Sequence, residues 1–575
     1  MEGREEDPHA IKSPLADVLK GVVLPKVPYT TFIFDNLRKN KKILGDRAVA
    51  VDIRRNQSLL FKDVEPMAIR FASALTKRGF EKGEVFFYIT YNAALLYALH
   101  FGVWLCGGAV RGCFQEEDVA EVERQMKDSK SRFILCEPET SELAMMAASR
   151  LGWPVNYFSI DGDVNGASPV EEMALKDDGS AYKKDIPISP EEDILFIPCT
   201  NGSTGLPKGA KHTHYNLVAQ GVSVGAPVDL EREDLQSETT LSIIGNFNVG
   251  PFLMIQISLM FGHTFISGSR FEKDIFFKMI EYHKPDTLVL FPYLANVISL
   301  SPELKNKNLS FIKKITLGGS VIDTSILGNL SKCFPNAIIN TIYGMTETLL
   351  ISSNGIGVHY KILRDPEKEA LLKLKVLEMD KESHISCGPL LPLVEAKVVD
   401  VESGTSLERG SKGRILVRSP FIMAGYTTSG CNQDQNPLPV DEHGWFDTGD
   451  FGFISEDGQV YVIDRLKLIF KYLMHQVSPA DIERVILRHP SVQSVGVVGL
   501  PNPETTSAAK AYIVIKPGCS ATEEEIKKLV ADSTPFYKHL HKGVVFTDKL
   551  PETRGGKLDR AALMKQAIRE MKASP

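Results

Sequence analysis

Residues 194–218 have the sequence ILFIPCTNGSTGLPKGAKHTHYNLV, and the change of pattern within this stretch indicates the fold. Residues 194–197 are apolar and of strand length, residues 200–208 are rich in glycine and hydroxyl groups, and an apolar segment begins at Asn216. This order predicts a strand, a loop and a helix. Strand-length apolar runs alternate with helix-like segments through most of the chain, so we expect an α/β fold.

The loop in this stretch has the chemistry of a phosphate-binding turn. Its glycines allow the backbone to approach a polyphosphate closely, its hydroxyl and N–H groups can donate to phosphate oxygens, and Lys208 supplies positive charge. The spacing differs from that of a Walker loop, and an ordinary turn is the alternative. The expected cofactor-binding residues are Thr200, Asn201, Gly202, Ser203, Thr204, Gly205 and Lys208.

A second, smaller domain is expected after about residue 464, where the pattern shortens to an α+β alternation. Ile482, Val485 and Ile486 mark one helix face, residues 492–500 and 511–515 have strand patterns, and Thr522 with Glu525 forms a capping box. At 575 residues the chain is too long for a single core. We therefore predict a domain over residues 1–463 and another over 464–575.

Composition limits the classes of function. The chain is 43% hydrophobic and 24% charged, with a net charge of -6, so nothing suggests a nucleic-acid partner. The longest apolar stretch, 247–262, contains Asn248, Pro251 and Gln256, which favours a buried helix over a transmembrane segment. The N-terminus lacks an apolar signal core and the C-terminus lacks Ser-Lys-Leu, so a cytoplasmic location is expected.

Further motifs follow the loop in a fixed order. They are Gly318-Gly319-Ser320, the run YGMTET over 343–348, GWFDTGD over 444–450, DRLK over 464–467 and LPETRGGK over 550–557. As a set, they resemble the adenylate-forming superfamily, which includes acyl- and aryl-CoA ligases such as 4-coumarate–CoA ligase, beetle luciferases and the adenylation domains of peptide synthetases. The resemblance spans roughly residues 30–570.

This resemblance implies a large multi-subdomain N-terminal AMP-binding domain, a small mobile C-terminal domain and a hinge near Lys467. A carboxylic acid would attack the α-phosphorus of ATP to give an acyl-adenylate and pyrophosphate, and coenzyme A would then accept the acyl group. The implied catalytic residues are Lys557, Glu347 and Thr346, and Glu347 would also hold Mg²⁺. The other implied ATP- or coenzyme-binding residues are Gly318, Gly319, Tyr343, Asp450, Arg465, Lys467 and Lys471.

Several positions depart from the pattern of the superfamily. Gly245 stands where relatives usually carry a histidine, and Ile342 replaces a glycine that lines the acyl site, which should narrow that pocket. Leu473-Met474 replaces the Lys-Gly pair that helps relatives to accept coenzyme A. The expected substrate-pocket residues are Gly245, Asn246, Phe247, Gly319, Ile342 and Met345.

Three functions therefore remain open. The first is a carboxylate–CoA ligase, the second an adenylate-forming enzyme with another acceptor, such as oxygen in luciferases, and the third a catalytically weak relative that binds nucleotide or acyl ligand. The partner is a small-molecule carboxylic acid in the first two, and no obligate protein partner is inferred. The charged stretch 358–383, which carries Leu371, Leu372, Leu374, Val376 and Leu377, is expected to form a surface helix.

Overall fold

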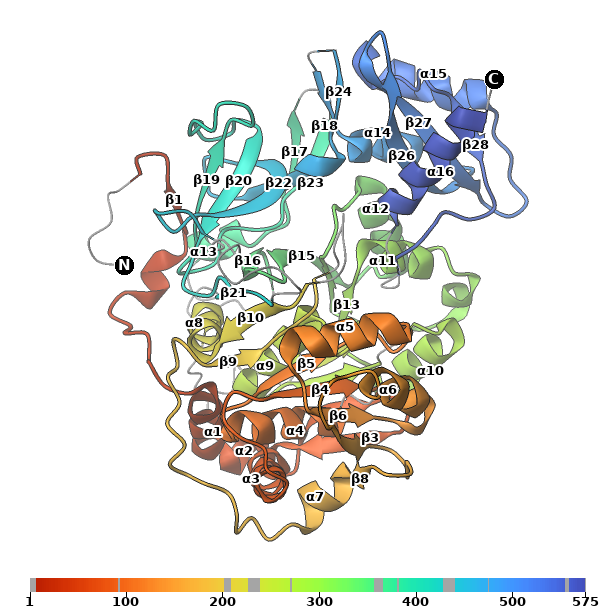
Figure 1. The fold of residues 1–575 in the computed structure, drawn as a ribbon. Coiled ribbons are helices and arrows are strands. Elements are labelled where there is room, and N and C mark those ends of the chain that lie inside the picture. Colours follow the sequence, from red (N-terminus) through yellow and green to blue (C-terminus); the bar gives the residue numbers. More distant parts are fainter. Residues whose placement is uncertain are drawn as a thin grey trace.

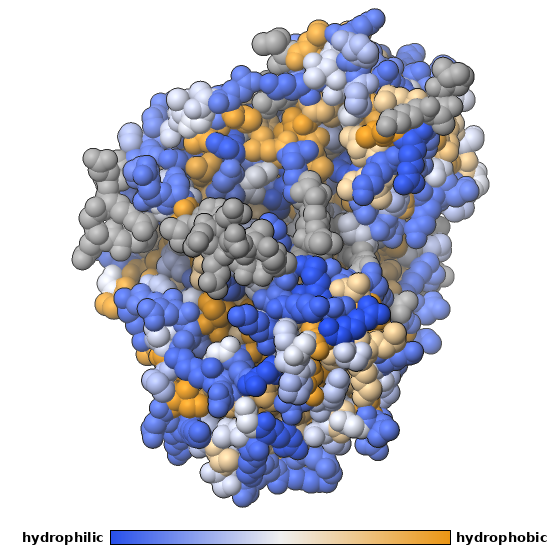
Figure 2. All heavy atoms as spheres, viewed as in Figure 1, coloured by the Kyte–Doolittle hydropathy of each residue, from blue (hydrophilic) through white to orange (hydrophobic). Residues whose placement is uncertain are grey.

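The computed structural model describes residues 7–91, 94–200, 208–225, 238–268, 271–355, 366–379, 382–427, 440–473, 475–553 and 558–573. Two eight-stranded sheets form the lower part of the molecule, a five-stranded sheet lies above them, and a second five-stranded sheet belongs to the C-terminal elements (Figure 1). Hydrophilic residues cover most of the face in Figure 2, and apolar residues gather in a patch in its upper half. The mixed sheets confirm the α/β fold, with a large N-terminal and a small C-terminal domain.

The first eight-stranded sheet has the order β21-β10-β9-β5-β4-β6-β7-β8. Its central strands are parallel and fully buried, as in sheets covered on both faces. The strands are β4 (Val85–Ile89), β5 (Ala109–Gly112), β6 (Phe133–Cys136), β7 (Asn156–Ser159), β8 (Ser168–Pro169), β9 (Ile194–Phe196), β10 (Ala210–Thr213) and β21 (Gly425–Tyr426). Its associated helices are α3 (Phe61–Lys77), α5 (Val119–Ser129), α6 (Ser141–Ala148) and α7 (Val170–Lys176).

The second eight-stranded sheet has the order β16-β15-β14-β13-β11-β12-β2-β3. Its strands are β2 (Ala48–Asp52), β3 (Gln57–Leu60), β11 (Thr239–Ser242), β12 (Thr264–Ser267), β13 (Thr287–Leu290), β14 (Lys314–Leu317), β15 (Ile338–Met345) and β16 (Leu349–Ser353). The helices α10 (Lys273–His283), α11 (Pro292–Ser299) and α12 (Thr324–Cys333) share a hydrophobic core with it. Helix α8 (His214–Val224) contacts β10 of the first sheet, and α1 (Tyr29–Lys39) and α2 (Lys41–Leu44) pack against other helices.

Two apolar helices, α4 (Ala94–Leu105) and α9 (Val249–Phe261), are buried on nearly every side. Helix α4 contacts both β5 of the first sheet and β3 of the second. A helix that is apolar all round is stable only when it is enclosed in this way. The prediction that 247–262 contains a buried core helix is confirmed, and no helix in the described residues is long and apolar enough to cross a membrane.

A third sheet, β1-β19-β20-β22-β23, consists of β1 (Ile11–Lys12), β19 (Glu395–Val399), β20 (Gly413–Arg418), β22 (Phe446–Ile454) and β23 (Val460–Arg465). The next strand, β24 (Phe470–Tyr472), belongs to the C-terminal sheet, which also contains β25 (His475–Val477), β26 (Val492–Asn502), β27 (Thr506–Ile515) and β28 (Val544–Phe546). The chain therefore changes sheets between Arg465 and Phe470, and the expected hinge residue Lys467 lies in this connection.

The C-terminal helices are α14 (Pro479–Ile486), α15 (Glu523–Ser533) and α16 (Arg560–Ala573). The predicted helix face of Ile482 and Ile486 is buried in α14, and the two predicted strands correspond to β26 and β27. The capping box of Thr522 and Glu525 is present at the start of α15. These local predictions are correct because each depends on residues within one or two turns of one another.

Two local predictions were wrong in detail. A strand, β10, lies between the glycine-rich loop and helix α8, because the segment pairs antiparallel with β9 and with β21. The described part of the stretch 358–383 forms only the short helix α13 (Pro366–Leu371). Val376 and Leu377 belong to strand β17 (Val376–Met379), which pairs with β18 (Glu382–Ile385). Strand pairing outweighs the leucine spacing that indicated one continuous helix.

Candidate active site

The predicted acyl-side and adenine-side residues meet at one edge of the second sheet. Strands β11, β13, β14 and β15 are parallel, and Leu317 is in register with Leu290 on one side and Thr341 on the other. The chain leaves β11 and β14 at this edge and continues into Gly245 and Gly318, and Ile342 follows Thr341 within β15 at the same edge. This edge is where open parallel sheets bind ligands.

A buried polar cluster lies beside this edge and joins two sheets. The Tyr343 hydroxyl donates to Asp450 Oδ2 at 2.5 Å, and Arg465 Nε lies 2.9 Å from Asp450 Oδ1. A second guanidinium nitrogen of Arg465 donates to the carbonyl of Thr448 at 2.9 Å. Tyr343 comes from β15, Asp450 from β22 and Arg465 from β23, so three of the predicted nucleotide-binding residues are brought together. We name these three residues the β15–β23 cluster.

Burial dominates the electrostatics of this cluster. It raises the pKa of Asp450 to about 6, although the neighbouring Arg465 and the hydrogen bond from Tyr343 favour the ionised carboxylate. Burial likewise raises the pKa of the Tyr343 hydroxyl, which stays a neutral donor. The ion pair between Asp450 and Arg465 is therefore not an ordinary surface ion pair. It holds an acceptor inside the protein, where a hydroxyl-bearing ligand would find few competing waters.

Glu347 lies in the turn between β15 and β16 and is buried, with 9% of its surface exposed. Its carboxylate accepts from the Tyr426 hydroxyl at 2.8 Å, and its backbone carbonyl accepts from the Met423 amide. Glu347 is thus not a solvated acid at a helix end, because the segment 421–426 packs on this turn. Tyr426 was not predicted, and no local pattern marks it.

The end of the glycine-rich loop reaches the same tyrosine. Lys208 Nζ lies 5.1 Å from the centre of the Tyr426 ring, a cation–π distance. The amide of Thr200 donates to the Lys208 carbonyl at 2.8 Å, and the amide of Lys208 donates to the Thr200 hydroxyl at 3.2 Å. These bonds close the base of the loop, so the described ends of the loop lie beside Glu347.

His212 positions the turn that contains Thr346 and Glu347. Its Nε2 lies 2.7 Å from the carbonyl oxygen of Thr346, and since a carbonyl only accepts, Nε2 carries the hydrogen. Burial lowers the pKa of His212 to about 4, so the ring is neutral near pH 7. His212 was not among the residues predicted from the sequence, although it lies only four residues after Lys208.

The predicted acyl side is filled by this protein's own apolar side chains. Phe247 is 1% exposed, and its ring packs against Phe114 with centroids 4.2 Å apart. A Cβ added to Gly245 would clash with the Phe247 ring, and one added to Gly318 would clash with the Ile342 side chain. Phe247 and Ile342 therefore occupy space beside the two glycines, as the replacement of glycine by Ile342 predicts.

The other expected pocket residues differ in their surroundings. Asn246 is buried, and its amide nitrogen donates to the Thr90 carbonyl at 3.3 Å, at the end of β4. Met345 is half-buried against the main apolar core, and Gly319 has a φ of 84°, which favours glycine. The expected pocket residues thus lie near one edge of the second sheet, but the Asn246 side chain is hydrogen-bonded to the chain at the end of β4 in the first sheet.

The two lysines near the expected hinge lie in different surroundings. Partial burial, together with the charge of Arg465, lowers the pKa of Lys467, while Glu347 and Asp450 act in the opposite direction. Lys467 is therefore close enough to sense the charges of the candidate site. Lys471 Nζ lies 2.7 Å from Glu402 on the exposed surface instead, so the structure does not bring Lys471 into the cluster.

Lys557 and the loop residues Asn201, Gly202, Ser203, Thr204 and Gly205 lie outside the described residues. The residues flanking Lys557 are described: Glu552 pairs with Leu558 in an isolated β-bridge. The Glu552 carboxylate accepts from the Tyr293 hydroxyl at 3.3 Å. Tyr293 is the second residue of α11, which begins two residues after β13 ends, so this flank of the C-terminal domain meets the same edge of the second sheet.

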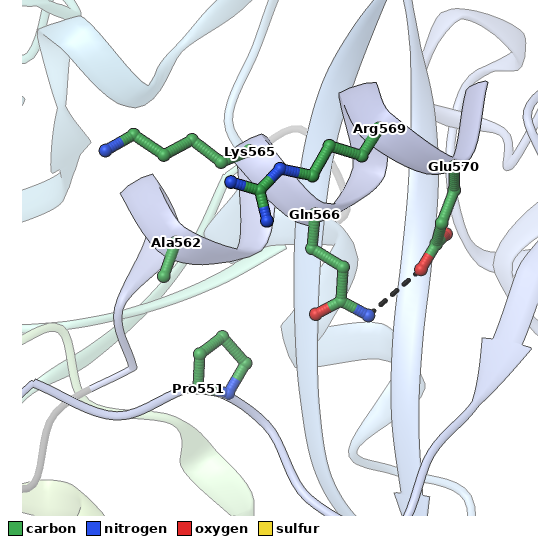
Figure 3. A pocket seen from close by; sticks show the side chains of 6 residues that line it. All are labelled: Pro551, Ala562, Lys565, Gln566, Arg569 and Glu570. Carbon is green, nitrogen blue, oxygen red and sulfur yellow. Dashed lines mark hydrogen bonds between the residues drawn. The ribbon is translucent and has the colours of Figure 1, made fainter. Parts of the chain in front are cut away.

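A depression of about 460 Å³ lies on helix α16, away from the predicted residues (Figure 3). Lys565 and Arg569 extend over it from α16, Pro551 lies opposite, and Gln566 donates to Glu570 at 3.0 Å. None of the predicted site residues that the structure describes lines this depression.

The residues present fit a magnesium ion only in company with a substrate. No group of three or more potential metal ligands occurs among the described residues. Glu347 offers a single buried carboxylate, and magnesium in nucleotide sites is commonly held by one or two carboxylates together with substrate phosphates. The carboxylate is thus suited to an ion that arrives with ATP.

Comparisons with known proteins agree with this geometry. The family model for AMP-binding enzymes matches residues 37–427, and the model for the C-terminal domain of these enzymes matches residues 481–557. The chain is 28% identical over 524 residues to 4-coumarate–CoA ligase 3 of Oryza sativa subsp. japonica, covering 90% of this chain and 89% of that protein.

Two solved structures have the same fold. The anthranilate CoA ligase AuaEII, crystallised with anthranoyl-AMP, superposes with a TM-score of 0.79 at 21% identity, covering 96% of this chain and 99% of that one. The amide bond synthetase McbA from Marinactinospora thermotolerans gives a TM-score of 0.74 at 24% identity, covering 94% and 100%. At these identities the likeness extends to the fold alone.

Proposed function

Since this chain belongs to the AMP-binding enzyme family of the adenylate-forming superfamily, we propose that it is an acid–thiol ligase. It activates a small carboxylic acid with ATP and transfers the acyl group to coenzyme A. In the first step a carboxylate oxygen bonds to the α-phosphorus of ATP and pyrophosphate leaves. In the second step the thiol sulfur bonds to the acyl carbon, AMP leaves, and the thiol proton passes to solvent.

The observation that carries the proposal is the β15–β23 cluster together with Glu347. Asp450 is a buried acceptor fixed by Tyr343 and Arg465, a geometry suited to the ribose hydroxyls of ATP. Glu347 and Lys208 both contact Tyr426, so an acid for magnesium and a cation for phosphate lie together. A nucleotide would span these groups, with its base toward Gly318 and Gly319.

We assign to Lys557 the role of the catalytic cation. The carboxylate and the α-phosphate repel one another, and an ammonium between them stabilises the charge that develops in the transition state. The contact between Glu552 and Tyr293 supports this assignment, because it holds the chain just before residue 557 at the edge where Gly318 lies. Thr346, held through its carbonyl by His212, would direct its hydroxyl or amide toward the same phosphate. Magnesium bound with the triphosphate would neutralise the leaving pyrophosphate.

The filled acyl side favours a compact acid. Phe247 and Ile342 take up space beside Gly245 and Gly318, so a large planar ring would have to displace buried side chains. Short aliphatic acids need no such movement. We therefore propose an acid smaller than the aromatic acids that the names of the CoA-ligase relatives indicate.

A different acceptor is the second candidate, and one observation favours it. Leu473, at the turn between β24 and β25, is 54% exposed and has a φ of 53°, a conformation that is costly for leucine. It stands where relatives usually carry a lysine that helps to accept coenzyme A. Because the fold also occurs in a protein named an amide bond synthetase, the fold does not choose the acceptor.

One assay tests both proposals. Carboxylate-dependent exchange of pyrophosphate into ATP is measured over a panel of acids from acetate to coumarate, and coenzyme A is then added while thioester and AMP are quantified. We expect exchange with short acids and thioester formation with the same acids. Exchange without thioester would support an adenylate-forming enzyme with another acceptor. Binding of ATP without any exchange would support a catalytically weak relative.

A further inference from the structure

A cavity of about 390 Å³ lies between the N-terminal and C-terminal domains, apart from the candidate active site. Its N-terminal wall comes from helices α11 and α12, and its C-terminal wall comes from residues 487–493 after α14, with Lys516 after β27. Figure 1 shows α11 and α12 directly below the C-terminal elements. A molecule in this cavity would touch both domains at once.

Among the described residues, every ionisable side chain that lines the cavity is basic. These side chains are Lys332 from the N-terminal wall and Arg488, His489 and Lys516 from the C-terminal wall. Within the described parts of the chain, neither Lys332 nor Arg488 lies within ion-pair distance of a carboxylate, and Lys516 Nζ donates to the Pro490 carbonyl at 2.7 Å. Three cations, Lys332, Arg488 and Lys516, face one space in a chain of net charge -6, and no carboxylate among the described lining residues offsets their mutual repulsion. The His489 ring accepts from the Ser491 amide through Nδ1 at 3.3 Å.

The uncharged lining is also suited to an oxyanion. Asn296, Ser325, Asn329 and Gln493 contribute amide and hydroxyl groups that can donate hydrogen bonds. Leu300 and Leu487 are the large apolar residues of the lining. Ligand cavities of this size are usually mostly apolar, whereas this one offers donors and positive charge on both walls. The chemistry therefore selects a small, hydrophilic, multiply charged anion.

The two walls are held together by a buried ion pair. Arg484 Nε, from α14, lies 3.8 Å from Asp323 Oδ2, and both side chains are less than a tenth exposed. The other oxygen of Asp323 caps α12 by accepting from the Ser325 amide at 2.7 Å. Ser325, two residues after Asp323, and Arg488, four residues after Arg484, line the cavity, so the ion pair joins the same two segments of chain that form the walls. Any movement that separates Arg484 from Asp323 would open it.

We propose that this interdomain cavity binds a small oxyanion with two or more negative charges, either a polycarboxylate or a phosphate. The anion bridges Lys332 of the N-terminal domain and Arg488 of the C-terminal domain. Bound in this way, it stabilises the domain arrangement in which Arg484 faces Asp323, because a ligand favours the state to which it binds best. The inference is independent of the proposed reaction.

Calorimetry on the full-length protein, without nucleotide or magnesium and at constant ionic strength, tests the binding. Citrate and inorganic phosphate are the two probes, and the tighter one identifies the class. We expect saturable binding that is weakened about tenfold in Lys332→Gln and in Arg488→Gln, the effect of losing one charge contact. Lys565→Gln and Arg569→Gln, which remove the exposed cations of the depression in Figure 3, should leave binding unchanged. Equal binding by all four variants, or no saturation, would overturn the proposal.

Hydrogen exchange distinguishes a bridge from a contact with one wall. Saturating citrate should slow exchange of amides in both α12 and residues 487–493 in the unmodified protein, and in neither segment of Arg488→Gln. Protection confined to one of the two segments would contradict bridging. Exchange of the core strand β4 reports whether each variant is folded. If Arg488→Gln loses protection in β4, that variant is unfolded, and Lys332→Gln takes its place in the test.

Discussion

The nucleotide side and the acyl side of the candidate site lie at one edge of the same sheet but are built in opposite ways. On the nucleotide side, the β15–β23 cluster buries a carboxylate and a hydroxyl and holds a partly exposed guanidinium against that carboxylate. On the acyl side, Phe247 and Ile342 fill the space beside two glycines with apolar volume. The first side is specified by charge and hydrogen bonding, and the second by shape.

This contrast indicates how each side can change. A buried charged group cannot be replaced without leaving its partner unpaired, which costs several kcal/mol, on the order of 3–5 for a fully buried pair. An apolar wall tolerates exchange of one side chain for another at about 1–3 kcal/mol. Substitutions of the charged groups on the nucleotide side should therefore be costly, whereas substitutions on the acyl side should change the size of the acid that is accepted. Four experiments test whether the two sides differ in this way.

The largest effect is expected from Lys557→Ala. Loss of the proposed cation should reduce ATP–pyrophosphate exchange on the order of 10³-fold, because the developing charge loses its stabilising group, while ATP affinity changes little. Exchange and ATP binding are measured on the same preparation. Lys549→Ala removes a nearby lysine and serves as the control. Undiminished exchange in Lys557→Ala would remove this residue from catalysis.

A smaller but clear effect is expected from Arg465→Gln. The substitution leaves the Asp450 carboxylate buried without its cation, so affinity for ATP should fall about 10- to 100-fold. The Arg465 side chain is 37% exposed, so the loss of folding stability should stay below that of a fully buried pair. Arg414→Gln breaks the neighbouring pair with Asp447 on β22 and is the matched control. Equal nucleotide affinity in both variants would show that the β15–β23 cluster does not contribute to nucleotide binding.

On the acyl side, Ile342→Ala should widen the range of acids. Removing this side chain next to Gly318 frees the space of a few methylene groups, so kcat/KM for benzoate relative to acetate should rise about tenfold. Ile342→Val removes a single methylene and should produce a smaller change in the same direction. ATP affinity should be unaffected in both variants. An unchanged preference would show that Ile342 does not border the acyl site.

The smallest effect is a pH dependence of nucleoside binding. Burial raises the pKa of Asp450 to about 6, above the 3.8 that is usual for an aspartate in water. The folded state therefore binds this proton more tightly than the unfolded state, and the contribution of Asp450 to stability falls as pH rises from about 4 to about 6.

Binding of ribose hydroxyls has the opposite sign, because the ionised carboxylate is the better acceptor. Affinity for adenosine, which carries no titrating phosphate, should fall as pH drops below about 6, by up to about tenfold per pH unit. Equilibrium binding between pH 5 and 8 measures this dependence. Asp450→Asn should bind weakly at every pH and show no inflection. An inflection retained in that variant would assign the titration to another group.

The sequence determined much of the fold and several members of the site. The apolar run at 194–197, the capping box at Thr522 and the shortened pattern after residue 464 each depend on neighbours within a few positions. Helices and strands respond to such local spacing, so these elements could be predicted. The motifs that contain Tyr343, Glu347, Asp450 and Arg465 could be recognised for the same reason, because each is a short continuous run.

Only the tertiary structure decided which of these residues act on one another. Tyr426 joins Lys208 to Glu347, and His212 holds Thr346 through a carbonyl that no sequence pattern reveals. The cavity between Lys332 and Arg488 also exists only because α12 and the segment after α14 meet when the domains dock. The physical reason is that side-chain pairing and burial depend on how distant segments pack, whereas the sequence displays only the spacing along each segment.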